Sequence, residues 1–211
     1  MKTMFLLATI ALAGTVGLGQ TSSPAIDQVE EDWQLVIASP DPVDVGPQIT
    51  TCMSPVSDGS TPFFALDMNY RDYPSYYSGG LEAAVISNSN GSVQDYSTQG
   101  DEVLGTANET ITWTQRMSLS GGTATYIVVN GQSTTWGSFG QDDGLGPVRF
   151  TTSVTSLASY SPDTSVAKSG VGWQSNRVSR MTLVRVRYYS GGQLVSTDTT
   201  SRSVNLSIAS N

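Results

Sequence analysis

The chain has 211 residues, a formal net charge of −8 and no histidine, and only 13% of its residues are charged. With no histidine and a single cysteine, Ser-His-Asp and Cys-His catalysis and imidazole- or thiolate-ligated metal centres are excluded. The acidic balance disfavours a nucleic-acid partner.

The first predicted element is a secretory signal. Lys2 precedes an apolar run from Met4 to about Leu12, and small residues follow. The run is too short to cross a bilayer and has no basic stop-transfer flank. We predict a signal peptide over residues 1–19, secretion to the extracellular space or periplasm, and no membrane span in the mature chain.

An acidic linker and one strand-rich domain are predicted next. Residues 20–32 are polar and acidic, and the apolar alternation that begins at Trp33 is typical of a strand. Short alternating segments continue to the end, with no helical period and no repeat, so residues 33–211 are predicted to form a single antiparallel β-sandwich. Tight hairpin turns are expected at four pairs, namely Asn90-Gly91, Gly121-Gly122, Asn130-Gly131 and Gly191-Gly192.

The charge is unevenly spread along the chain. Up to Thr110 there are fourteen acidic and two basic residues, and from Ile111 onward there are eight basic and four acidic residues. Acidic and basic strands that interleave in one sandwich would explain this division, as would subunits that meet head to tail. The oligomeric state stays open. The lone Cys52 suits a buried apolar position, with a disulfide-linked dimer as the alternative.

A tyrosine-rich segment between Asn69 and Gly80 reads NYRDYPSYYSGG and connects two predicted strands. Tyr70 continues the apolar face of the first strand. The connector has turn chemistry, and recognition residues of sandwiches often lie on such loops. Aromatic rings and planar polar groups suit sugars, whereas loop tyrosines can equally cover a core edge. The candidate ligand-binding residues are Arg71, Asp72, Tyr73, Tyr76, Tyr77 and Trp136.

Two further polar features have alternative interpretations. Asp142 and Asp143, in the sequence GQDDGLG, could contribute oxygen ligands to Ca²⁺, although adjacent aspartates are also ordinary turn residues. Ca²⁺ is the one cofactor considered. Arg185 and Arg187 form a stripe with Tyr189 that suits either a groove for acidic glycans or a solvent face with cross-strand partners.

The stretch TITWTQRMSLSGGTATYIVVNGQSTTWGSFG resembles the central hairpins of the concanavalin A-like, laminin-G-like jelly rolls. There, an aromatic-bearing strand precedes a strand that ends in Val-Asn-Gly and then an outer strand, here Trp113, then Val129 to Gly131, then QSTTWGSF. The resemblance could span Trp33 to Ile208. It implies a jelly-roll sandwich, and the VEEDWQLVIASPDP segment is similar in character to secreted bacterial proteins of unassigned activity.

Jelly-roll hydrolases often carry a clustered Glu-x-Asp-x-x-Glu strand, which is absent from this sequence. Glu82 could still meet Glu109 or Asp67 across a cleft. The expected function is therefore a secreted, non-catalytic module that recognises carbohydrate or a cell surface. A structural protein of the cell envelope is the first alternative and a jelly-roll glycoside hydrolase the second.

Overall fold

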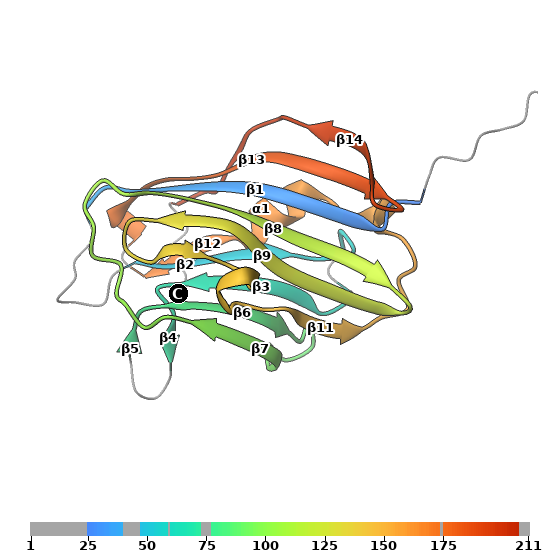
Figure 1. Cartoon of the computed structure of the whole chain (residues 1–211), viewed down its shortest axis with the longest axis horizontal. Coiled ribbons are helices and arrows are strands. Elements are labelled where there is room, and N and C mark those ends of the chain that lie inside the picture. The colour runs from blue at the N-terminus through green and yellow to red at the C-terminus, as the bar shows by residue number, and fades with distance from the viewer. Residues whose placement is uncertain (1–24, 40–46, 59, 73–76, 174, 207–211) are drawn as a thin grey trace, which may run out of the picture.

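The computed structural model describes residues 25–39, 47–58, 60–72, 77–173 and 175–206. They form two antiparallel sheets that pack face to face (Figure 1). The prediction of an all-β sandwich is confirmed. Among the described residues, no helix is long and apolar enough to cross a membrane.

The larger sheet has the strand order β10-β9-β8-β1-β13-β14, with β11 paired to β9 and β15 paired to β13. At its centre the N-terminal strand β1 lies between β8, from the middle of the chain, and β13, from near its C-terminal end, and pairs with both. Its strands are β1 (Gln28–Ile37), β8 (Thr110–Ser120), β9 (Thr123–Ser133), β10 (Gly137–Phe139), β11 (Val148–Thr151), β13 (Val178–Ser190), β14 (Gln193–Asp198) and β15 (Arg202–Ser203).

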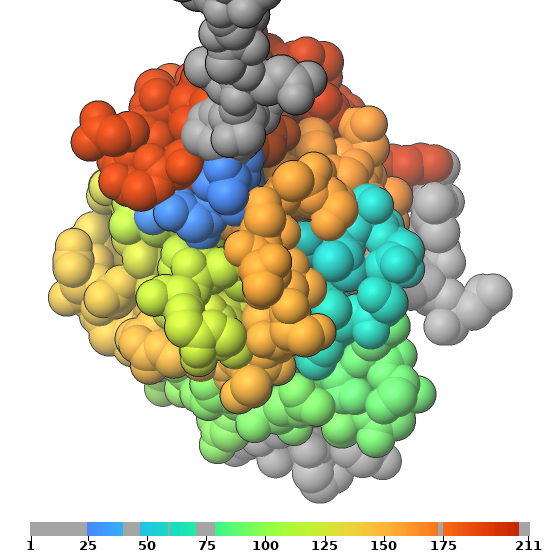
Figure 2. Space-filling model, turned by 90° about the vertical axis from the view of Figure 1, so that its right-hand side faces the viewer, coloured from blue at the N-terminus to red at the C-terminus, as the bar shows by residue number. Residues whose placement is uncertain are grey.

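The smaller sheet has the order β12-β2-β3-β6-β7, and the short pair β4-β5 extends from it between β3 and β6. Its strands are β2 (Gln48–Met53), β3 (Phe63–Met68), β4 (Arg71–Asp72), β5 (Tyr77–Ser78), β6 (Leu81–Ile86), β7 (Val93–Gln99) and β12 (Gly170–Trp173). The helical elements are η1 (Gln141–Asp143), η2 (Leu157–Ser159), α1 (Pro162–Lys168) and η3 (Ser175–Arg177). In Figure 2 the orange segment that follows β11 covers one end of the sandwich.

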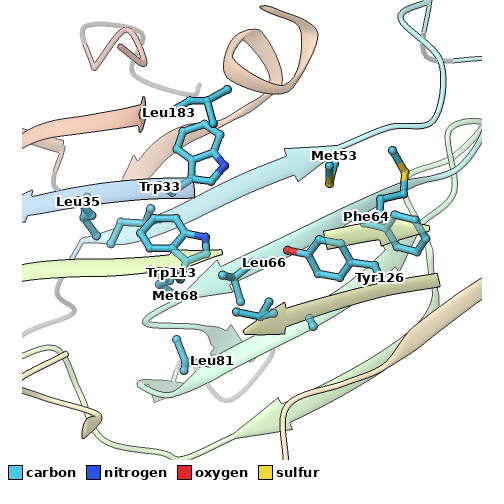
Figure 3. Close-up of a cluster of buried hydrophobic side chains, with 14 of the residues drawn as sticks. Trp33, Leu35, Met53, Phe64, Leu66, Met68, Leu81, Trp113, Tyr126 and Leu183 are labelled. Atoms are coloured by element: carbon cyan, nitrogen blue, oxygen red, sulfur yellow. The ribbon is translucent and has the colours of Figure 1, made fainter. Parts of the chain in front are cut away.

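Aromatic rings from both sheets fill the core (Figure 3). Trp33 and Trp113 are cross-strand partners with ring planes 6° apart and centroids 6.1 Å apart. Phe64 of the smaller sheet stacks on Tyr126 of the larger one, with centroids 5.1 Å apart. Phe64, Leu66 and Met68 alternate along β3 and face this core, where each is 1% exposed or less.

The first strand begins earlier than the sequence suggested. We predicted a linker up to residue 32, whereas β1 starts at Gln28. Glu30 and Glu31 are buried at 4% and 0% exposure, because one faces arginines and the other faces hydrogen-bond donors. A strand segment with several charged residues has the composition of a linker, and the sequence does not reveal the distant partners that allow these residues to be buried.

Three of the four predicted turns are found between consecutive strands, at Asn90-Gly91, Gly121-Gly122 and Gly191-Gly192. The prediction of a turn at Asn130-Gly131 is wrong, because β9 runs through this pair to Ser133. Asn130 has a φ of 55°, in the left-handed region. This conformation is typical of a tight turn, but within β9 it produces a bulge. The alternation of Val204, Leu206 and Ile208 suggested a closing strand, but β15 ends at Ser203 and residues 204–206 are in no strand; residue 208 lies outside the described residues.

Candidate functional site

A row of ion pairs crosses the outer face of the larger sheet. Glu30 of β1 lies between Arg116 of β8 and Arg187 of β13, whose nitrogens are 2.5 and 3.1 Å from its carboxylate oxygens. Asp32 binds Arg187 at 2.7 Å and Arg185 at 2.6 Å. The acidic strand from the N-terminal half thus lies between basic strands from the C-terminal half, which confirms that the two kinds of strand interleave.

The strand pairing of the larger sheet has four register shifts, and two of them lie beside these ion pairs. Between β8 and β9 the register skips, so that two residues, Asn130 and Gly131, lie opposite Trp113. Between β1 and β13 a second skip leaves Val184 as the extra residue. By alternation in the sequence Val184 would share the face of the buried Val186, but the bulge turns it outward, where it is 43% exposed. Bulges re-aim side chains and are common beside functional sites.

Both bulges border the same hollow, of about 720 Å³, which we call the arginine groove. Its floor is formed by the central strands β1 and β8, and its walls by β9, β13 and the chain just after β14. The lining residues are Asp32, Trp33, Gln34, Thr112, Trp113, Thr114, Asn130, Val184, Arg185, Arg187 and Thr199. A hollow of this size on a rigid sheet suits a small ligand or a few units of a chain-like one.

The polar groups of the arginine groove are held in fixed orientations. Asp32 accepts a hydrogen bond from the Thr114 hydroxyl at 2.7 Å in addition to its two arginine contacts. Gln34 uses its carbonyl oxygen to accept from Arg180 at 2.8 Å, so its amide N–H groups are turned elsewhere. The exposed carboxamide of Asn130 makes no hydrogen bond to any described residue. The groove therefore offers both donors and acceptors.

On the inner face of the same strands lies a buried polar network. Glu31 accepts hydrogen bonds from Trp33 Nε1 at 2.9 Å, from the Gln115 amide and from the Tyr160 hydroxyl. Gln115 in turn accepts from Tyr126 at 2.9 Å, and from Thr51 of the other sheet at 3.0 Å. Burial raises the pKa of Glu31 although these donors oppose the shift. The network links the two sheets through the contact of Thr51 with Gln115. The Glu31 carboxylate is fully buried, so a ligand in solution does not reach it.

The tyrosine-rich segment lies away from the arginine groove. Arg71 and Asp72 form β4 and pair with Tyr77 and its neighbour in β5, at the opposite side of Figure 1 from β13 and β14. Tyr73 and Tyr76 lie outside the described residues. A ligand-binding role for these tyrosines stays a prediction.

Trp136 fastens the turn between β9 and β10. It is half-buried, and its indole N–H donates to the main-chain oxygen of Glu102 at 2.8 Å. Its ring packs edge-on against Phe139, with ring centroids 6.4 Å apart. These contacts use its indole N–H and one edge of its ring, and a ligand-binding role for Trp136 stays a prediction. Trp136 does not line the arginine groove.

The Asp142-Asp143 pair forms part of η1 and is exposed beside a hollow of about 170 Å³. Among the described residues, no group of three or more His, Cys, Asp or Glu side chains could hold a metal ion. Cys52 is free and buried, and burial raises the pKa of its thiol to about 12, so it behaves as the apolar residue that we predicted.

The three carboxylates considered for hydrolysis do not share a cleft. Asp67 and Glu82 are cross-strand partners on the smaller sheet, but Asp67 binds the Thr50 hydroxyl on the opposite neighbouring strand. Glu109 caps the turn after β9, accepting from the amides of Thr134 at 2.5 Å and Thr135 at 3.0 Å. None of these acids lines any of the hollows described here.

Removal of the Glu109 cap tests this structural role. We expect Glu109→Ala to lower the free energy of unfolding by about 2 kcal/mol, because two main-chain amides and the hydroxyls of Ser133 and Thr135 lose their acceptor. Glu109→Gln, which keeps one acceptor oxygen, should cost less. Urea unfolding of both variants measures the difference, and equal midpoints for the wild type and Glu109→Ala would contradict it.

A second hollow, of about 950 Å³, lies between α1 and the edge strands β12 and β15. It is lined by Lys168 at the end of α1 and by Arg202, which binds Asp163 at 2.7 Å and Asp198 at 2.8 Å. Hydrogen bonds from Thr200 and then from Arg202 lower the pKa of Asp198 to about 2. The arginine here is fully engaged, whereas the arginine groove keeps unoccupied donors and lies over the central strands.

The signal for the arginine groove in the sequence was partial. The Arg185 and Arg187 stripe was visible, but Asp32, Gln34 and Asn130 come from segments predicted as linker, strand and turn. The pairing of β1, β8 and β9 brings them to one face and the bulges adjust their positions, and a one-residue skip in register leaves no distinct mark in a sequence. No protein-family model matches the chain, and no curated protein is significantly similar to it.

Proposed function

We propose that this protein is an exported, non-catalytic domain that binds carbohydrate in the arginine groove. The supporting observation is that two of the four register shifts of the larger sheet, at Asn130 and Val184, border one groove. A bulge gives up ladder hydrogen bonds, and two of them that converge on a single hollow favour a binding role for it.

The chemistry of the groove suits hydroxyl-rich ligands. Sugars present many groups that donate and accept, and the planar side chains of Gln34, Asn130 and Arg185 can pair with adjacent hydroxyls. Thr112 and Thr199 add hydroxyls at the rim, and Val184 adds an apolar contact for a ring face. The apolar run of residues 4–12 supports export to the extracellular space or periplasm, where polysaccharides are common.

A glycan array followed by calorimetry on the purified mature chain tests this proposal. Asn130→Gly removes the carboxamide while glycine accepts the positive φ, and we expect roughly fivefold weaker binding, the effect of one neutral hydrogen bond. Asn108→Gly is the matched control, because Asn108 is also exposed and has a φ of 57° but lies outside the groove. Binding that survives Asn130→Gly and is lost in Tyr77→Ala would place the site on the tyrosine-rich segment instead.

An interaction role at the sheet edge is the second candidate function. β14 ends the larger sheet, and Leu194 and Val195 on it are 55% and 43% exposed. This edge has no lysine or proline, the residues that commonly discourage strand pairing. A second copy of the chain could pair along it. Self-association in sedimentation experiments, together with no binding to any polysaccharide, would favour this function over carbohydrate binding.

A further inference from the structure

The outer face around the arginine groove is positively charged on an acidic protein. Arg185 and Arg187 line the groove against one carboxylate, that of Asp32. Arg116 and Arg180 lie beside the groove on the same face, with Glu30 as the second carboxylate. The whole chain has a formal charge of −8. A local excess of guanidinium groups on such a protein creates a field that attracts an anionic ligand to this face.

The carboxylate in the groove is already neutralised. Asp32 accepts from Arg187 and Thr114 with one oxygen and from Arg185 with the other, all between 2.6 and 2.7 Å. Its negative charge therefore serves to hold the arginines in place. An incoming anion meets guanidinium groups in front of this carboxylate, with their positions already set.

Part of the donor capacity of these arginines is unused. Arg185 directs both Nε and Nη2 at one oxygen of Asp32, which leaves Nη1 without an acceptor among the described residues, and its side chain is 47% exposed. Arg180 contacts the neutral Gln34 rather than an acid. A planar guanidinium with free N–H groups binds carboxylate or sulfate oxygens in a directed way that a lysine does not reproduce.

We infer that the ligand of the arginine groove is an acidic polysaccharide, in which a carboxylate or sulfate group docks on Arg185. Arg187 acts as a positioning residue, since it is 24% exposed and bridges Asp32 and Glu30. Sugar hydroxyls beside the acidic group meet Gln34 on the floor and Asn130 on the opposite wall. This inference rests on the proposed carbohydrate-binding function and specifies the class of sugar.

Calorimetry on the full mature chain at fixed ionic strength tests this inference. The probes are polygalacturonate for carboxylates, dextran sulfate for sulfate esters, neutral dextran, and single-stranded DNA as an unrelated polyanion. We expect one of the two acidic polysaccharides to bind at least tenfold more tightly than dextran and DNA. Arg185→Ala should weaken that binding by about tenfold or more, as expected for a charge-assisted hydrogen bond.

Two matched variants separate a site from a general field. Arg149→Ala removes the same charge from an exposed position on β11, outside the groove, and should leave binding nearly unchanged. Arg185→Lys keeps the charge and loses the planar fork, so binding should remain well below the wild type. Equal losses in Arg149→Ala and Arg185→Ala, or equally tight binding of DNA, would mean that the protein attracts polyanions without a site.

The outcomes also distinguish this inference from the function on which it rests. Binding of neutral glycans that is weakened by Asn130→Gly and unaffected by Arg185→Ala would overturn the acidic ligand and leave the carbohydrate site in place. Absence of binding to any polysaccharide would overturn both. Circular dichroism and urea unfolding of each variant check that weaker binding does not result from unfolding. We expect the Arg185 variants to stay folded, because the Arg185 side chain is 47% exposed.

Discussion

Replacement of Glu31 by alanine should lower the free energy of unfolding by roughly 3–5 kcal/mol. Its carboxylate is the common acceptor for the Trp33 indole, the Gln115 amide and the Tyr160 hydroxyl, and all three donors would remain buried without a partner. The effect should be large because Gln115 also connects to Thr51 of the other sheet. Urea or thermal unfolding at neutral pH gives the value.

Glu31→Gln separates the loss of hydrogen bonds from the loss of charge. The amide oxygen can accept from Trp33 and Gln115, and the amide nitrogen can donate to the Tyr160 hydroxyl, which accepts as well as donates. We expect this variant to cost much less than Glu31→Ala at neutral pH, because the charge itself is unfavourably buried. If the glutamine variant were as unstable as the alanine variant, the negative charge rather than the acceptor geometry would hold the network together.

The stability of the protein should fall as the pH rises from about 4 to about 6, and Asp67 is one source of this fall. Burial raises the pKa of Asp67 from 3.8 to about 6, against the hydrogen bond from Thr50. Between these two values the folded chain binds more protons than the unfolded chain, so a rise in pH favours unfolding. A shift of this size corresponds to at most about 3 kcal/mol, at 1.36 kcal/mol per pKa unit. Burial raises the pKa of Glu31 too, so its contribution has the same sign.

Asp67→Asn tests the contribution of this carboxyl. Asparagine keeps an acceptor for Thr50 but does not titrate, so the variant should lose less stability than the wild type between pH 4 and 6. Asp143→Asn, at an exposed position of η1, is the control and should follow the wild-type curve. Parallel curves for the wild type and Asp67→Asn would show that Asp67 ionises freely in the folded chain. Below pH 4 the sign reverses for Asp198, because its lowered pKa favours the folded state only while it is ionised.

The sandwich and its hairpins could be predicted because their signals are local. Alternation at Phe64, Leu66 and Met68 reports a face, and Gly121-Gly122 reports a turn, within a few residues. The start of β1 could not be predicted in this way. Whether Glu30 and Glu31 belong to a strand depends on Arg116 and Gln115, which lie more than eighty residues away.

The candidate site was even less visible in the sequence. Asn130-Gly131 carries the same preference for positive φ in a turn and in a bulge, and the choice depends on packing. A Cβ atom at Gly131 would lie 2.4 Å from the Phe139 ring, so the glycine admits that ring against β9 as the strand continues. Trp136 shows the converse case: an aromatic residue in a polar stretch suggested recognition, and the structure gives it internal contacts, which the sequence did not indicate.

The position of the arginine groove on the central strands has a consequence for the thermodynamics of binding. Most of its lining belongs to strands that are hydrogen-bonded on both sides, and ion pairs already restrict the rotamers of Arg185 and Arg187. Little conformational entropy is left for a ligand to remove from the protein. The unfavourable entropy of association then comes mainly from the ligand, so a stiff saccharide should gain more affinity here than a flexible one of the same composition.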